Sequence, residues 1–175
     1  MLATELRKTE VVMLDGFING MRQTIEDNAG YRRIFELLYK ILPIEVGIVY
    51  VFLIITAWMK QDIGISKLIL VPLVVFVGVT VIRKLIDAPR PYEVDGIEPL
   101  IPKDKHGESF PSRHVVSAMI ITMAGFYMNV WIGISLAVVT VLIAVMRVVA
   151  GVHYVKDVAA GLAISIIVGV IGFFL

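Results

Sequence analysis

The chain contains 175 residues, of which 58% are hydrophobic, and its formal net charge is +1. A mean hydropathy of +0.88 lies far above that of a soluble domain of this length, so the composition predicts one domain inserted in a lipid bilayer. The near-neutral charge argues against a nucleic-acid partner, because binding a phosphate backbone requires a broadly basic face. The absence of cysteine excludes thiolate nucleophiles, disulfides and sulfur-ligated metals. The charged N-terminus MLATELRKTE does not resemble a cleaved secretory signal.

The first 40 residues differ from the rest, because they hold six Lys/Arg and six Asp/Glu. Apolar residues recur there at spacings of three and four: Leu14, Phe17, Met21 and Ile25. Residues 28–30 (Asn-Ala-Gly) break this pattern, and a second short stripe follows through Ile34, Leu37 and Leu38. We therefore predict two amphipathic helices in residues 1–40, which either lie along the membrane surface or pack against the rest of the protein.

Residues 41–175 are predicted to form an all-α, polytopic membrane bundle. Five apolar runs approach the length needed to cross about 30 Å of hydrocarbon: 41–59, 64–83, 114–129, 131–147 and 157–175. Pro43 is expected in the first turn of the first helix, where proline is tolerated. The longest connection is the polar loop 87–111.

The polar residues outside the first 40 concentrate at helix ends. The second run ends near Arg83 and the third begins near His114, whereas the fourth ends near Arg147 and the fifth begins near Asp157. Successive membrane helices run antiparallel, so we expect all four ends at one face of the membrane.

The first polar block is Arg83-Lys84-Leu-Ile-Asp87-Ala-Pro-Arg90-Pro91. Guanidinium groups bind phosphate in a bidentate manner and stay charged at any relevant pH. Prolines on both sides of Arg90 stiffen the segment that carries it. Alone, a basic pair at a helix end often marks only the membrane interface.

The second block is Ser109-Phe110-Pro111-Ser112-Arg113-His114. We expect Ser112 to cap the third membrane helix through its hydroxyl. A helix N-terminus also attracts anions through its N–H groups and dipole. His114 there is suited to give a proton to a leaving oxygen.

The third block runs from Arg147 to Asp157 and contains His153. A spacing of four residues on a helical turn brings Asp157 within reach of the His153 ring, fixing its tautomer and leaving one nitrogen free to attack phosphorus. A metal site would need a third ligand, for which His106 or His114 is available. However, the nearby arginines repel a cation and no Asp/Glu cluster accompanies the histidines, so we expect neither a metal nor another cofactor.

Together the three blocks resemble the motifs of the type 2 phosphatidic acid phosphatase (PAP2) superfamily. That family's pattern is Lys-x6-Arg-Pro, then Pro-Ser-Gly-His, then Ser-Arg-x5-His-x3-Asp. This chain has Arg83-x6-Arg90-Pro91, Pro111-Ser112-Arg113-His114 and Met146-Arg147-x5-His153-x3-Asp157. The resemblance covers roughly residues 65–175.

The resemblance implies a metal-independent lipid phosphatase that works by double displacement through a phosphohistidine. It implies His153 as nucleophile, Asp157 as its orienting carboxylate and His114 as the acid that protonates the leaving group. The residues implied to hold the phosphoryl oxygens are Arg83, Arg90, Ser112 and Arg147, with the backbone N–H near residue 113.

Three positions depart from the family pattern. Arg83 stands in place of Lys, Met146 in place of Ser and Arg113 in place of Gly. Arg113 adds a cation at the mouth of the site, and our hypothesis is that it binds a second phosphate or an anionic head group.

The expected partners are therefore the lipid bilayer and a membrane lipid phosphate, of the undecaprenyl diphosphate, phosphatidylglycerophosphate or phosphatidate type. The alternative function is a non-catalytic protein that binds or transports an anionic lipid with the same cationic site. The resemblance favours a multi-pass protein of the cell membrane with its active site on the extracytoplasmic face.

Overall fold

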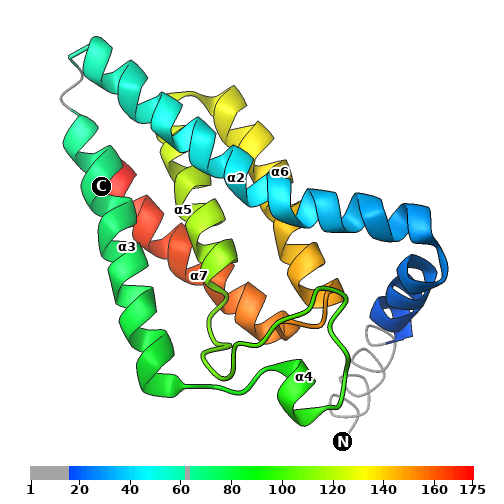
Figure 1. Cartoon of the computed structure of the whole chain (residues 1–175). Coiled ribbons are helices and arrows are strands. Elements are labelled where there is room, and N and C mark those ends of the chain that lie inside the picture. Colours follow the sequence, from blue (N-terminus) through cyan, green and yellow to red (C-terminus); the bar gives the residue numbers. More distant parts are fainter. Residues whose placement is uncertain (1–15, 62–63) are drawn as a thin grey trace, which may run out of the picture.

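The computed structural model describes residues 16–61 and 64–175, and within them every regular element is helical (Figure 1). A helix covers residues 16–27. It is followed by α2 (Ala29–Met59), α3 (Ile65–Ile86), the short α4 (Pro91–Val94), α5 (Arg113–Met128), α6 (Val130–Val149) and α7 (Val155–Gly169), which continues as the π-helical turn η1 (Val170–Phe174). The prediction of an all-α helical bundle is confirmed.

Four helical stretches of the described chain are long and apolar enough to cross a membrane: Ala29–Met59, Ile65–Val94, Val130–Val149 and Val155–Phe174. The predicted run 114–129 forms α5, which has 16 residues and spans roughly 24 Å at 1.5 Å per residue. It occupies the centre of the bundle, where it packs against α2, α3, α6, α7 and η1.

The long helix α2 differs from the prediction. It begins at Ala29 rather than residue 41, because the Asn28 side chain accepts hydrogen bonds from the backbone N–H groups of Gly30 (2.9 Å) and Tyr31 (3.1 Å). Pro43 lies in its interior and does not end it. The second predicted amphipathic helix is therefore the first part of α2, and the helix boundary lies at Asn28 rather than at residue 40.

The inner face of α2 is formed by side chains other than those of the predicted stripe. Its buried side chains are Phe35, Tyr39, Leu42, Val46, Leu53 and Ala57. Ile34, Leu37 and Leu38 are exposed on the outer side. An apolar outer surface suits a helix surrounded by lipid, where both faces are hydrophobic.

The first predicted amphipathic helix is present over residues 16–27, whereas Leu14 and the rest of residues 1–15 lie outside the described chain. Met21 and Ile25 pack against the core as the spacing predicts, but Phe17 is 67% exposed. Arg22 is buried instead, and its guanidinium donates hydrogen bonds to the carbonyls of Val149 (3.0 Å) and Glu98 (2.5 Å). This helix is thereby tied to the end of α6.

The polar ends of α3, α5, α6 and α7 meet at one end of the bundle, near α4 in Figure 1. The backbone N–H of Ser112, at the start of α5, donates to the carbonyl of Asp157 in α7 (3.0 Å). The N–H of Leu100 donates to the carbonyl of Ala150 after α6 (3.1 Å). The three polar blocks thus lie together, as the helix count predicts.

Candidate active site

A cavity of about 130 Å³ opens where the polar helix ends converge. It is lined by Tyr39, Arg83, Arg90, Lys103, Lys105, Arg113, His114, Arg147, Val152 and His153. Six of these are basic and none is a carboxylate. None of the four arginines forms an ion pair with a carboxylate elsewhere in the described chain. Lys105 is paired with Glu108 at 2.6 Å, so within the described residues the cations without a counter-ion are the four arginines and Lys103. Cations gathered without counter-ions are costly to bury, so the cavity is suited to hold an anion.

Backbone carbonyls fix two of the arginines at the base of the cavity. Arg83, near the end of α3, donates to the carbonyls of Pro111 and Ser109, the latter at 3.3 Å. Arg90, which precedes α4, donates to the carbonyls of Gly107 (2.9 Å) and Val152 (3.4 Å). Arg83 therefore links the long loop to α3, and Arg90 links it to the turn between α6 and α7.

His153 and Asp157 lie close together, with a serine hydroxyl beside both. The His153 Nδ1 atom is 3.5 Å from Asp157 Oδ2, which is long for a hydrogen bond. The Ser109 hydroxyl donates to Asp157 Oδ2 (2.5 Å), and its oxygen lies 3.3 Å from His153 Nδ1. An Nδ1–H of His153 therefore has Ser109 and Asp157 as acceptors, and this tautomer leaves the Nε2 lone pair free. Ser109 and Asp157 are both fully buried.

The environment of His153 favours a neutral imidazole. His153 lies in the turn between α6 and α7, outside the membrane-spanning helices. Burial lowers the pKa of its ring, Asp157 opposes this effect, and the positive charges of Arg90 and Arg83 add to it. A neutral ring is the form that can act as a nucleophile.

Ser112 precedes α5 as predicted, but its hydroxyl does not cap the helix. The side chain makes no capping hydrogen bond, and its buried Oγ has no partner in the described chain. The Oδ1 atom of Asp157 is likewise buried without a partner there. Ser112 and Asp157 lie next to the cavity lining rather than in it.

His114 and Arg113, the first two residues of α5, both line the cavity. Both also line a neighbouring apolar hollow of about 350 Å³ between α2, α3, α5 and α6. The Arg113 guanidinium lies 5.9 Å from the centre of the Phe76 ring. Arg113 is the first residue of α5 and does not have a positive φ, so its side chain is accommodated without backbone strain.

Glu93 holds the loop between α4 and α5 in place. Its carboxylate accepts hydrogen bonds from the backbone N–H groups of Arg90 (2.6 Å) and Gly107 (3.0 Å). It also contacts the Nδ1 of His106 at 3.0 Å, so His106 belongs to this loop contact and not to the cavity. The described residues contain no group of three His, Asp or Glu side chains that could hold a metal ion.

Four residues of the site were not among the predicted site residues: Tyr39, Lys103, Lys105 and Ser109. Ser109 belongs to the second polar block and Lys103 and Lys105 to the long loop, so proximity in sequence gave a signal for these three. Tyr39 comes from α2, and its hydroxyl accepts a hydrogen bond from Arg147. No motif points to it.

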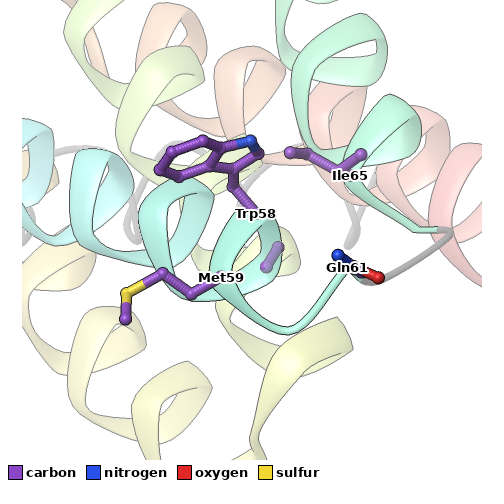
Figure 2. Close-up of a pocket in the computed structure, with 5 residues that line it drawn as sticks. Trp58, Met59, Gln61 and Ile65 are labelled. Atoms are coloured by element: carbon purple, nitrogen blue, oxygen red, sulfur yellow. The ribbon is translucent and has the colours of Figure 1, made fainter.

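A larger hollow of about 550 Å³ lies beside the turn from α2 to α3 (Figure 2). Its lining residues, Ala57, Trp58, Met59, Gln61 and Ile65, carry no charge. Ile65 is 18 residues before Arg83 on α3, which is about 27 Å along the helix. This hollow is therefore remote from the cationic cavity and offers no catalytic group.

Comparisons with known proteins agree with this geometry. The model of the PAP2 superfamily matches residues 64–174. Undecaprenyl-diphosphatase BcrC of Bacillus subtilis (strain 168) is 29% identical over 130 residues, which cover 72% of this chain and 67% of that protein.

Two crystal structures have a similar fold. Aquifex aeolicus LpxE has a TM-score of 0.68 at 25% identity, over 87% of this chain and 92% of LpxE. The first transmembrane PAP2 type phosphatidylglycerolphosphate phosphatase from Bacillus subtilis has a TM-score of 0.64 at 16% identity, over 91% of this chain and 84% of that one. The family match extends over more than half of the sequence, so the chain belongs to the PAP2 superfamily.

Proposed function

We propose that the protein is a membrane lipid phosphatase that releases phosphate from a lipid phosphate or diphosphate through a phosphohistidine at His153. The observation that carries this proposal is the cavity itself, in which six basic side chains and His153 face one small volume without a carboxylate. The relatives in the PAP2 superfamily, among them an undecaprenyl-diphosphatase, support the same activity.

In the first step, the His153 Nε2 lone pair attacks phosphorus and the bond from phosphorus to the lipid-side oxygen breaks. His114 gives its proton to that oxygen, and a phosphate in the cavity favours the protonated ring that this step requires. Ser109 and Asp157 stabilise the positive charge that develops on the His153 ring.

In the second step, water attacks the phosphohistidine, and His114 takes up a proton from that water. The bond between Nε2 and phosphorus breaks, which restores His153 and releases inorganic phosphate. Arg83, Arg90, Arg147, Ser112 and the N-terminus of α5 stabilise the negative charge on the phosphoryl oxygens in both steps.

The apolar hollows beside the cavity support a lipid substrate. The 350 Å³ hollow at Arg113 and His114 shares Phe76, Ser117 and Ile121 with another of about 290 Å³ further along α3 and α5. An apolar chain lying there would keep its phosphate at the cationic cavity. The polar end of the site and an apolar path therefore meet at Arg113.

Within this class we propose a polyprenyl diphosphate as the substrate, in preference to phosphatidylglycerophosphate or phosphatidate. Arg113 and Lys103 add two positive charges to those of Arg83, Arg90 and Arg147, whereas Lys105 is paired with Glu108. A second phosphate group is a suitable partner for the additional cations.

The rates of hydrolysis of a lipid diphosphate and its monophosphate should differ less in Arg113→Gly than in the wild type. An unchanged ratio contradicts this role of Arg113.

The decisive experiment measures phosphate release by the purified protein from a panel of lipid phosphates, with and without EDTA. We expect release from one lipid class, undiminished by EDTA and abolished in His153→Ala. Binding of the lipid without phosphate release would instead support a non-catalytic lipid-binding protein. Loss of activity in EDTA would contradict the metal-independent mechanism.

We further propose that the cationic cavity faces the extracytoplasmic side of the cell membrane. A multi-pass arrangement follows from the apolar helices and the membrane relatives. The resemblance of the three motifs to those of the PAP2 superfamily favours the extracytoplasmic side.

A further inference from the structure

Tyr39 is a buried polar residue of the candidate active site that lies outside the PAP2 motifs. It is on α2, before the residues 64–174 that the family model matches. Its side chain is 6% exposed and lines the cationic cavity. A hydroxyl buried among cations needs a specific partner, and here that partner is Arg147.

The Arg147 side chain makes both its hydrogen bond and its cation–π contact with Tyr39. One Nη atom donates a hydrogen bond to the Tyr39 hydroxyl, and the guanidinium carbon lies 4.0 Å from the centre of the Tyr39 ring. Arg147 is 4% exposed, forms no ion pair with a carboxylate of the described chain, and its buried Nε has no partner there. The ring and hydroxyl thus stabilise a buried cation that lacks a counter-ion.

The other arginines at the base of the cavity are held differently. Arg83 and Arg90 donate to backbone carbonyls, which remain when neighbouring side chains change. Arg147 is instead held by one side chain from a different helix. Lys103 lies near the same ring, with its Nζ 5.8 Å from the ring centre. Tyr39 therefore contacts two of the cations that line the cavity.

We infer that Tyr39 is a positioning residue for phosphoryl binding. Its hydroxyl and ring hold the Arg147 guanidinium at the cavity, so that the Nε–H and the remaining N–H groups of Arg147 are available to phosphoryl oxygens. This inference rests on the proposed phosphatase function. It also gives α2, which the family model does not cover, a part in forming the active site.

The test is Tyr39→Phe, which keeps the ring and removes only the hydroxyl. We expect kcat/KM for lipid phosphate hydrolysis to fall about tenfold or more, the range for losing a hydrogen bond to a charged group. Inhibition by orthovanadate, which mimics the phosphoryl group in transfer, should weaken by a similar factor. Tyr127→Phe makes the same chemical change near the other end of α5 and should leave both values unchanged.

A double-mutant cycle distinguishes positioning from general packing. If Tyr39 acts through Arg147, Tyr39→Phe should have little further effect on vanadate inhibition in an Arg147→Lys background. Equal losses in both backgrounds overturn the inference, as does a fully active Tyr39→Phe variant. A folded wild-type protein that hydrolyses no lipid phosphate overturns the proposed function itself.

Discussion

The hydroxyl of Ser109 lies between the nucleophile and the carboxylate of the candidate site. Because His153 Nδ1 and Asp157 Oδ2 are 3.5 Å apart, Ser109 provides the shorter link, at 2.5 Å to the carboxylate and 3.3 Å to the ring. We expect Ser109→Ala to lower kcat about tenfold or more, through loss of a hydrogen bond to a charged group. Phosphate release by the purified variant measures this effect.

A matched control is Ser165→Ala. Ser165 is also fully buried, but its hydroxyl donates to the carbonyls of Val116 and Gly161, away from the cavity. Its loss should lower the unfolding temperature without changing kcat. If Ser109→Ala and Ser165→Ala behave alike, Ser109 has no special part in orienting His153.

The lowered pKa of His153 predicts the acid limb of the pH profile. The nucleophile must be neutral, so a ring pKa below the usual value of about 6.5 keeps the enzyme active at lower pH than an ordinary histidine allows. Burial is the main cause and the charge of Arg90 adds to it. Arg90→Gln should therefore raise the pKa of His153 and move the acid limb of kcat/KM to higher pH.

Arg90→Lys is the control for this shift, because it keeps the positive charge. The ionisation of the substrate is the same for all variants, so a difference between the Gln and Lys profiles reports on the enzyme. Coincident acid limbs would mean that His153 does not control this part of the profile.

At the scale of elements, the N-terminal helix is attached to the end of α6 by one side chain. Arg22 donates to the carbonyl of Val149, at the end of α6, and to the carbonyl of Glu98, in the long loop. Gly151, with φ of 71°, lies beside it, and an added Cβ would be 2.4 Å from an Arg22 Nη atom. We expect Arg22→Ala to lower the free energy of unfolding by about 1.5–3 kcal/mol, because a charged donor to buried carbonyls is lost.

The control for Arg22→Ala is Arg32→Ala on α2. Arg32 pairs with Glu36 at 3.2 Å, but both side chains are more than a third exposed. Exposed pairs contribute little, so thermal unfolding of this variant should match the wild type closely. Equal unfolding temperatures for both variants would show that Arg22 does not fasten the N-terminal helix.

The sequence predicts the number and order of the long helices better than their inner faces. Apolar length identifies the runs that form α3, α6 and α7. The stripe Ile34, Leu37 and Leu38 instead left open whether it faces the membrane or the protein, and it is exposed. In a membrane, apolar side chains face lipid as readily as the protein interior, so hydrophobic spacing does not separate the two. The start of α2 is set by the Asn28 cap and not by the change in composition near residue 40.

For the whole molecule, helix counting and the three motifs predict which end carries the site. His153, His114, Arg83, Arg90, Arg113 and Arg147 all line one cavity as this reasoning requires. Tyr39 could not be predicted in this way, because its position depends on how α2 crosses α5 and α6 (Figure 1). The capping role of Ser112 failed because its hydroxyl is buried without a partner in the described chain.

The orientation of the whole molecule can be tested directly, because the chain has no cysteine and any introduced thiol is unique. Asp104 is exposed in the loop beside the cationic cavity. Lys60 is exposed at the end of α2, just before α3 begins at Ile65, and so lies at the opposite end of α3 from the cavity. If the cavity is extracytoplasmic, an impermeant thiol reagent should label Asp104→Cys in intact cells. Lys60→Cys should then be labelled only after permeabilisation, since α3 spans the bilayer between them. The reverse pattern places the active site in the cytoplasm, and labelling of both in intact cells contradicts a membrane-spanning α3.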